Sequence, residues 1–259
     1  MRKIFSILKL FGLDLVALFN TVKGLHFYFA DFLKLKKQKN GDKNFAFGKP
    51  YPELTDRFSD AGVMSGHYFH QDLLVAKRIF INNPKKHIDI GSRIDGFVAH
   101  VAAFREIEVV DIRPQTSKVT NIRFATMDLM KLPDNLVNAY DSVSSLHAIE
   151  HFGLGRYGDP IDYMGYLKAL DNIYKILEIG GRFYFSVPIG RQRIEFNAHR
   201  VFSVNYLLSL FVDKYDIISF SYVNDSGDLF ENVSLDDESL KDNFGCVFGC
   251  GIFELIKNR

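Results

Sequence analysis

The sequence predicts an α/β domain built on a mostly parallel sheet with an antiparallel last strand, preceded by an N-terminal helical extension. Two observations predict this class. Short β-type apolar runs alternate with longer amphipathic stretches from about residue 65 onward, which is the pattern of a parallel sheet with connecting helices. Near the end of the chain, two strand-like runs follow each other with no helical pattern between them. Such neighbours usually pair antiparallel.

The expected elements follow in chain order. A short strand ending in glycine precedes a helical pattern, three further strand-like runs come next, and a long amphipathic stretch leads into a fifth strand. A helix, a strand, a polar loop (residues 224–243) and a last strand complete the domain. These segments are KKHIDIG, GFVAHVAAF, IEVVDI, NIRFATMD, YDSVSSL, PIDYMGYLKALDNIYKILEIGG, RFYFSVP, VNYLLSLF, YDIISFSYV and CVFGCGIFELIK.

Composition is that of one large domain with a buried core, since 47% of the 259 residues are hydrophobic and 24% are charged. Residues 1–40 hold eight Lys and Arg against two Asp, a net charge of +6, so the overall +1 leaves −5 for the remainder. The basic charge is therefore local, and the negative remainder argues against a nucleic-acid partner. We place an extension and linker at residues 1–49 and the domain at residues 50–259.

The N-terminal segment MRKIFSILKLFGLDLVALFNTV is neither a signal peptide nor a membrane span. Lys9 and Asp14 interrupt it, and no apolar run approaches the roughly 18 residues that a spanning helix needs. Two interpretations stay open for residues 1–40. An apolar helix followed by KLKKQKN suits the surface of an anionic membrane, or the helix docks on the domain with a solvated Lys-rich linker after it. The predicted location is the cytoplasm, either free or at the inner face of the membrane.

The two cysteines, Cys246 and Cys250, lie on the predicted last strand. Residues four apart on a strand are about 13 Å from each other, which is too far for a disulfide. We expect two packing thiols in a reducing compartment. A metal site there would need ligands from elsewhere in the chain.

The turn HIDIGSRIDGF has features of a nucleotide-type cofactor site. Asp89 ends the first strand, Gly91 lets the backbone pass close to a ligand, and the helix that follows offers free amides. Asp111 lies twenty residues after Gly91, where an acidic side chain can take both ribose hydroxyls. Met127 and Asp128, at the end of the third strand, suit an adenine face and amine. The predicted cofactor-binding set is Asp89, Gly91, Ser92, Arg93, Gly96, Asp111, Met127, Asp128 and Ser145.

The same turn argues against a dinucleotide. Arg93 stands where a dinucleotide fold usually has a glycine that lets the backbone meet a pyrophosphate. S-adenosyl-L-methionine has no pyrophosphate, and an acidic group such as Asp89 is compatible with its cationic end. Strand capping explains each acidic residue alone, but the three acidic strand ends together favour a cofactor site.

The pentapeptide HAIEH, residues 147–151, has the H-x-x-E-H spacing of some zinc peptidases. A peptidase needs a longer metal-bearing helix, and three glycines follow within eight residues of this one. Three roles stay open. His147, Glu150 and His151 on one helical turn can bind a divalent ion, one histidine can be a metal-free general base, or the group only orders the loop. We favour the metal-free base, because two histidines with one carboxylate suit a transition metal better than magnesium.

The closing pair of strands resembles the seven-stranded, Rossmann-like sheet of class I S-adenosylmethionine-dependent methyltransferases. YDSVSSLHAIEHF is similar to the fourth-strand motif of small-molecule members. Ubiquinone-type O-methyltransferases have a Glu-x-x-Glu-His segment implicated in metal binding, and His147 replaces the first Glu here. Over residues 50–256 the chain resembles the uncharacterised family called domain of unknown function 268, through SGHYFHQDLLVA, HIDIGSRIDGFVAHV, SSLHAIEHFGLGRYGDPID, YFSVPIG, FNAHRVFS and FGCGIFEL.

The resemblance implies an O-methyltransferase that uses S-adenosyl-L-methionine. Members of the family are often encoded near surface-glycan genes, which implies a sugar, nucleotide-sugar or glycan acceptor and a role in surface polysaccharide biosynthesis. The alternative is a catalytically silent scaffold or binding protein of glycan assembly.

Polar residues in the shared blocks are the candidate acceptor site. Arginine suits a bidentate grip on phosphate or carboxylate, and an Arg-Asp ion pair between the two loops is the open alternative. The segment before the first domain helix is expected to fold over the cofactor. The predicted acceptor-binding residues are Tyr68, His70, Gln71, Asp72, Arg156, Tyr157, Asp159, Asn197, His199 and Arg200.

Overall fold

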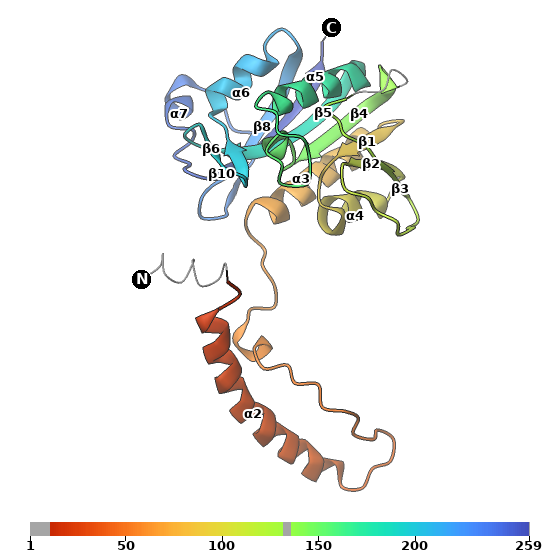
Figure 1. The fold of residues 1–259 in the computed structure, drawn as a ribbon, viewed down its shortest axis with the longest axis vertical. Coiled ribbons are helices and arrows are strands. Elements are labelled where there is room, and N and C mark those ends of the chain that lie inside the picture. The colour runs from red at the N-terminus through yellow and green to blue at the C-terminus, as the bar shows by residue number, and fades with distance from the viewer. Residues whose placement is uncertain (1–10, 132–135, 259) are drawn as a thin grey trace. The chain divides into compact units, whose positions relative to one another are not determined.

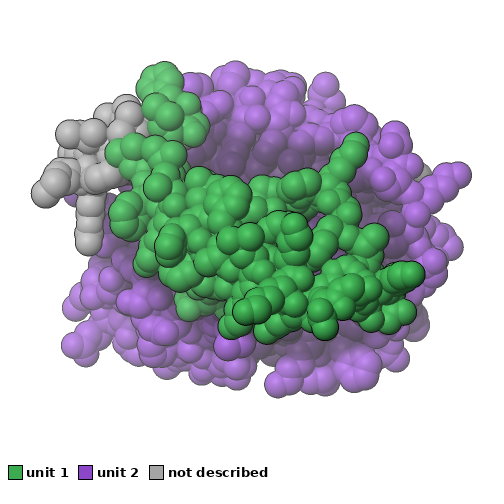
Figure 2. Space-filling model, turned by 90° about the horizontal axis from the view of Figure 1, so that it is seen from below, with its two compact units in different colours: residues 1–63 green, residues 64–259 purple. Residues whose placement is uncertain are grey.

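The structure, a computed structural model, describes residues 11–131 and 136–258. The chain divides into two compact units, residues 1–63 and residues 64–259 (Figure 2). The predicted domain boundary between residues 49 and 50 remains a prediction. Each unit is described by itself.

Over its described residues, 11–63, the first unit contains one long helix, α2 (Leu15–Lys39), and a 3₁₀ turn at Asp56–Phe58. Asp14 caps α2, because its Oδ1 accepts hydrogen bonds from the amides of Val16 and Ala17. The returning chain packs against Gly24, where any Cβ would collide with the carbonyl oxygen of Leu54.

The predicted Lys-rich linker is wrong, since KLKKQK forms the last turns of α2. Lysine and glutamine are good helix formers and no breaker precedes Asn40, whose left-handed backbone ends the helix. Residues 1–10 of the predicted extension lie outside the described part of the chain. Within the described part, no helix is long and apolar enough to cross a membrane.

The second unit is built on a sheet of eight strands in the order β3-β2-β1-β4-β5-β10-β8-β9. The first five of these strands are parallel, and β10 runs antiparallel to both β5 and β8. The predicted parallel sheet with an antiparallel last strand is confirmed. The bounds are β1 His87–Ile90, β2 Ile107–Asp111, β3 Ile122–Thr126, β4 Tyr140–Leu146, β5 Leu177–Ile189, β8 Tyr215–Val223, β9 Leu229–Phe230 and β10 Gly249–Lys257, with a separate hairpin of β6 Arg193–Glu195 and β7 His199–Val201.

The sheet has one strand more than the seven expected, because β9 pairs with the end of β8 inside the segment predicted to be a polar loop. The same segment holds a short helix, α7 (Asp237–Lys241), where we predicted none. Asp236 caps α7 by accepting a hydrogen bond from the Ser239 amide. Neither β9 nor α7 could be predicted from this polar segment, because neither has a strong apolar periodicity.

Helices cover both faces of the sheet (Figure 1). One face carries α3 (His67–Asn82) and a helix that begins with a π-helical turn at Ile94–Val98 and continues as α4 (Ala99–Ala102). The other face carries α5 (Gly165–Ile176) and α6 (Val204–Phe211). The connection between β2 and β3, residues 112–121, contains no helix.

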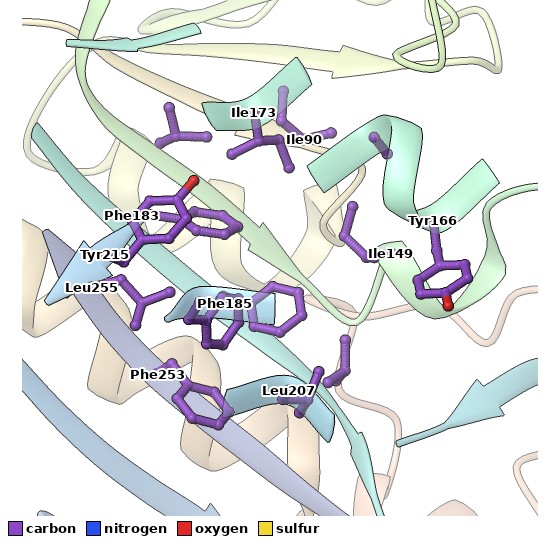
Figure 3. Close-up of a cluster of buried hydrophobic side chains, with 14 of the residues drawn as sticks. Ile90, Ile149, Tyr166, Ile173, Phe183, Phe185, Leu207, Tyr215, Phe253 and Leu255 are labelled. Atoms are coloured by element: carbon purple, nitrogen blue, oxygen red, sulfur yellow. The ribbon is translucent and has the colours of Figure 1, made fainter. Parts of the chain in front are cut away.

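Strand β5 shows how the two faces form the core. Phe183 and Phe185 point to the side of α5 and α6, where they contact Tyr215 of β8 and Phe253 of β10 (Figure 3). Tyr184 between them points to the side of α3. All three side chains are fully buried, as expected for a strand covered on both faces.

The carboxyl ends of the parallel strands meet at one edge of the sheet, and β10 begins there because it runs the opposite way. Cys250 pairs in register with Pro188 near the end of β5. The predicted last strand began at Cys246, but β10 begins at Gly249, and Cys246 belongs to the turn before it. Both thiols are buried and free.

Candidate active site

A hollow of about 540 Å³, counting the space at its mouth, opens at this carboxyl edge. Its walls come from the turn after β1, the end of β2, the loop after β3 and the turn after β4. The hollow brings together eight of the predicted site residues, which are Gly91, Asp111, Met127, Asp128, His147, His151, Tyr157 and Asp159. A shallower hollow beside it adds Tyr68, Ser92 and Arg93.

Gly91 forms the wall after β1 and has a left-handed φ of 71°. A Cβ there would lie 3.0 Å from the Cβ of Ala148 on the turn after β4. A side chain would therefore be strained by the backbone and crowded by its neighbour. Glycine keeps the backbone open to the hollow.

Asp111 ends β2 and lines the hollow. Both of its oxygens face Arg113, with Nε to Oδ1 at 3.0 Å and a terminal nitrogen to Oδ2 at 2.6 Å. The Arg113 guanidinium also lies 4.2 Å from the centre of the Tyr157 ring. Sequence reasoning missed Arg113, although its place two residues after Asp111 was a signal. A ligand hydroxyl must share this carboxylate with Arg113 or displace it.

Asp128 lines the hollow after β3, and its Oδ1 accepts a hydrogen bond from the Met130 amide at 3.0 Å. Met127 lies beside it, and its thioether offers an apolar surface to the hollow. Both lie where the sequence predicted an adenine contact.

Asp89 lies beneath the hollow and does not line it. Its Oδ1 accepts hydrogen bonds from the hydroxyls of Ser92 and Ser144, each at 2.6 Å, and its Oδ2 accepts one from the Ser92 amide at 3.0 Å. Burial raises the pKa of Asp89 to about 6, and the serine hydrogen bonds oppose the shift. The Ser145 hydroxyl, also predicted to bind cofactor, donates to the carbonyl of Ile90. Asp89 and Ser145 therefore hold the backbone beneath the hollow by hydrogen bonds to Ser92 and Ile90.

A buried histidine that the sequence did not flag continues this polar layer. His87 Nε2 lies 3.1 Å from the hydroxyl of Ser144, and its Nδ1 lies 2.7 Å from that of Ser142. Burial lowers the pKa of His87 to about 3, so the ring is neutral. The signal was present in YDSVSSL, where serines alternate on one face of the strand.

The HAIEH pentapeptide is a tight turn and not the helical turn expected. Strand β4 ends at Leu146, His147 has a left-handed φ of 50°, and a single 3₁₀ turn spans Ile149–His151. Glu150 is buried, and its Oε1 lies 2.8 Å from Nδ1 of His147 and 3.7 Å from Nε2 of His151. Burial disfavours the charge of Glu150, but His147 and then His151 outweigh it and lower its pKa. One carboxylate thus serves two histidines.

His147 lies between Glu150, which faces its Nδ1, and Cys250. Burial opposes its charge, but Cys250 and Glu150 outweigh burial and raise its pKa well above 6.5. The ring stacks on that of His67, with centres 5.1 Å apart and planes 10° from parallel. Burial lowers the pKa of His67 to about 4. Among the described residues, Nε2 of His147 has no hydrogen-bond partner.

His151 faces the hollow with its proton placed by the backbone. Its Nδ1 lies 2.6 Å from the carbonyl oxygen of Ala198, which can only accept, so Nδ1 carries the hydrogen. The neutral ring then keeps a lone pair on Nε2. Burial lowers the pKa of His151, while Glu150 partly opposes the shift. His151 is therefore neutral and able to accept a proton at pH 7.

The loop GLGRYGDP is organised by Asp159. Its oxygens accept hydrogen bonds from the amides of Gly153, Gly155 and Tyr157 at 2.8, 3.1 and 3.2 Å. Arg156 donates to the carbonyl of Ala198 at 3.0 Å. No Arg-Asp ion pair joins the two loops in the described residues, so that alternative is wrong.

Arg200, predicted to bind an acceptor, donates its hydrogen bonds to backbone carbonyls instead. It donates to the carbonyls of Phe152 and Tyr163 at 2.7 and 3.1 Å, and its guanidinium lies 4.8 Å from the centre of the Tyr166 ring. It is nearly buried and does not line the hollow with His151. Arg200 therefore stabilises the turn that carries His151.

The remaining predicted residues lie around the site. His199 Nε2 lies 3.0 Å from Glu195, and Asn197 is exposed beside it. The hydroxyl of Ser186 donates to Oε1 of Gln71, which anchors the start of α3 to β5.

Of the other predicted residues of α3, Tyr68 lines the second hollow, whereas His70 and Asp72 line neither. Burial raises the pKa of Asp72 to about 6, and this carboxylate occupies the space that a side chain at Gly96 would need. Tyr68 packs on His147 and under Arg93. His70 is half-buried and lines neither hollow.

Three solved structures have a similar fold. N-methyltransferase NodS from Bradyrhizobium japonicum, crystallised with S-adenosyl-l-homocysteine, is 14% identical, with 79% of this chain and 92% of that chain covered and a TM-score of 0.50. The 1,6-didemethyltoxoflavin-N1-methyltransferase of Burkholderia thailandensis is 14% identical over 73% and 79% of the chains, with a TM-score of 0.52. The [4+2]-cyclase SpnF is 13% identical over 82% and 85%, with a TM-score of 0.50. The fold is that of class I S-adenosylmethionine-dependent methyltransferases.

The chain belongs to the family described as "Caenorhabditis protein of unknown function, DUF268". The family model matches residues 100–244, more than half of the 259 residues. No curated protein matches the sequence.

Proposed function

We propose that the protein is an S-adenosylmethionine-dependent O-methyltransferase whose acceptor is a sugar or glycan precursor. The observation that carries this proposal is the single hollow that gathers Gly91, Asp111, Asp128 and His151. NodS and the toxoflavin enzyme share the fold and were crystallised with S-adenosylhomocysteine, which supports the cofactor. The acceptor class is the one that the family resemblance implies.

The cofactor-binding residues act by shape and by charge. S-adenosylmethionine would supply the methyl group. Asp111 would accept hydrogen bonds from the ribose hydroxyls in place of Arg113, and Met127 and Asp128 would meet the adenine. Gly91 allows close approach of the backbone.

His151 is the residue that we assign to the acceptor proton. Its Nε2 lone pair can take a hydroxyl proton as the oxygen attacks, and Glu150 at 3.7 Å stabilises the imidazolium that forms. Arg156 and Tyr157 lie at the same turn and would orient the acceptor. Orientation of the two reactants supplies much of the acceleration in such a transfer.

The decisive experiment is calorimetry with S-adenosylmethionine and S-adenosylhomocysteine, followed by methyl transfer to a panel of sugars and nucleotide sugars. We expect micromolar binding and transfer to a hydroxyl. Lack of binding at millimolar cofactor would reject the enzyme and favour the silent scaffold. Binding without transfer would keep the cofactor site and reject the reaction, because SpnF has the same fold and is a cyclase.

We also propose that the N-terminal segment contacts anionic membrane. Helix α2 exposes large apolar side chains such as Phe19 and Leu33, and its last turn carries Lys36, Lys37 and Lys39. Deletion of residues 1–40 should release the protein from phosphatidylglycerol vesicles, and salt should weaken binding of the full chain. A full chain that never binds vesicles, together with an insoluble truncated one, would show that the helix completes the protein fold.

A further inference from the structure

Three metal-ligating side chains meet at the edge of the sheet where the hollow opens. His67 is the first residue of α3, His147 follows β4, and Cys250 is the second residue of β10. One ring nitrogen of each histidine and the sulfur of Cys250 all lie within 4.8 Å of one another. We propose that these three residues bind a zinc ion.

The state of His147 points independently to a ligand. Its side chain is only 4% exposed, and its Nε2 has no hydrogen-bond partner among the described residues. An unpaired polar atom at such depth is costly unless something binds it. Its Nδ1 meanwhile faces Glu150 at 2.8 Å, which is the carboxylate-histidine arrangement that orients a histidine toward a metal.

The donor set selects the kind of metal. Two imidazoles and one thiolate suit zinc, whereas magnesium and calcium prefer oxygen ligands. Bonds of 2.0–2.3 Å in a tetrahedron put the donors roughly 3.3 to 3.7 Å apart. Donor atoms at the upper limit of 4.8 Å must therefore approach one another by about 1 Å to bind zinc. His67 is only half-buried and can supply this movement. On zinc binding, the Cys250 thiol, now 3.6 Å from Oε1 of Gln71, and Nε2 of His147 would each release a proton to solvent.

A zinc ion here would lie at the wall of the hollow, because His147 lines it. Three protein ligands leave a fourth coordination position for water or a substrate oxygen. The catalytic consequence rests on the proposed function: zinc would lower the pKa of the acceptor hydroxyl, and His151 would take its proton. Zinc binding would also exclude His147 as the general base, because the lone pair on its Nε2 would be bound to the metal.

The test is titration of the chelator-treated full chain with Co²⁺, which reports thiolate ligation by a near-ultraviolet charge-transfer band. We expect one cobalt per chain, displaced by one equivalent of zinc. Cys250→Ser should abolish the band, and His67→Gln should weaken zinc binding at least tenfold. Glu150→Gln should weaken it about 10- to 100-fold. Cys246→Ser, the other buried cysteine, should change neither measurement and is the matched control.

Equal bands in Cys250→Ser and the unmodified chain, or loss of the band in Cys246→Ser, would overturn the site. Circular dichroism identifies a Cys250→Ser chain that does not fold, and His67→Gln at the half-buried position then decides. Calorimetry with S-adenosylhomocysteine separates the two proposals. A chain that binds this ligand but no cobalt rejects only the metal site, and a chain that binds cobalt but no ligand rejects only the methyltransferase.

Discussion

Replacement of Asp111 by alanine tests the cofactor site most directly. The carboxylate lines the hollow at the end of β2, where its only side-chain partner in the described residues is Arg113. If the ribose hydroxyls bind there, the variant loses two hydrogen bonds to a charged acceptor, each worth about 1.5–3 kcal/mol. The bound state of the unmodified protein must first give up the Arg113 pair.

The Arg113 side chain is 51% exposed, so solvent screens this pair and its loss costs at most about 1 kcal/mol. Subtracting it leaves about 2–5 kcal/mol, which corresponds to a Kd raised roughly 30- to 4,000-fold. The folded protein loses the same pair and the hydrogen bond from the Arg113 amide to Oδ1, together about 1–2 kcal/mol. The Tm should fall by only a few degrees.

Calorimetry with S-adenosylhomocysteine and a thermal melt measure the two quantities on one preparation. Glu106→Ala is the matched control, because Glu106 pairs with the exposed Arg123 at 2.9 Å at the opposite end of the same strand. It should leave the Kd unchanged. An Asp111→Ala chain whose Kd changes less than fivefold, or whose loss of stability matches its loss of affinity, would show that this carboxylate is only a structural partner of Arg113.

Three further variants separate structure from chemistry. Gly91→Ala should lower the free energy of unfolding by about 1–3 kcal/mol in urea, because φ is positive and Ala148 is close; an unchanged midpoint would contradict this. Arg200→Met should cost about 2–4 kcal/mol in the same assay while the Kd for cofactor stays constant, since its donors serve carbonyls; a selective loss of acceptor affinity would restore its predicted role. In the unmodified enzyme, kcat/KM should rise with pH through a pKa below 6.5, which is that of His151. His151→Gln should lower kcat/KM 10²- to 10⁴-fold and abolish this rise, the acid limb of the pH profile. A variant that keeps the acid limb would show that another group is the base. The charged and titratable groups around His151 are Glu150, His147, Arg156, Tyr157 and His199.

The sequence predicted the sheet well because its strands are strong local signals. The runs YDIISFSYV and YDSVSSL became β8 and β4 without a change of boundary, and IEVVDI became β2, which is one residue shorter. Elements with a polar sequence were missed. Helix α7 depends on a cap at Asp236, and β9 depends on the edge of β8. Their signals come from neighbours in space, which periodicity does not report.

One wall of the hollow was predictable because parallel strands bring their carboxyl ends to one edge. Gly91, Asp111 and Asp128 follow three such strands, and the hollow contains all three. The cluster of His67, His147 and Cys250 was not predictable, because it needs the register of β10 against β5 and the start of α3. Residues 67 and 250 are far apart in sequence.

The backbone of one residue decides what HAIEH can do. In an α-helix, His147 and His151 would share a face and one metal ion. The left-handed backbone of His147 and the 3₁₀ turn after it put the two rings on different partners, one beside Cys250 and one beside Ala198. Glu150 remains within reach of both. Glu150→Gln should therefore weaken zinc and lower kcat/KM together, whereas His67→Gln should weaken zinc without removing the acid limb that His151 sets. Equal zinc affinity in Glu150→Gln and the unmodified chain would show that the carboxylate serves His151 alone.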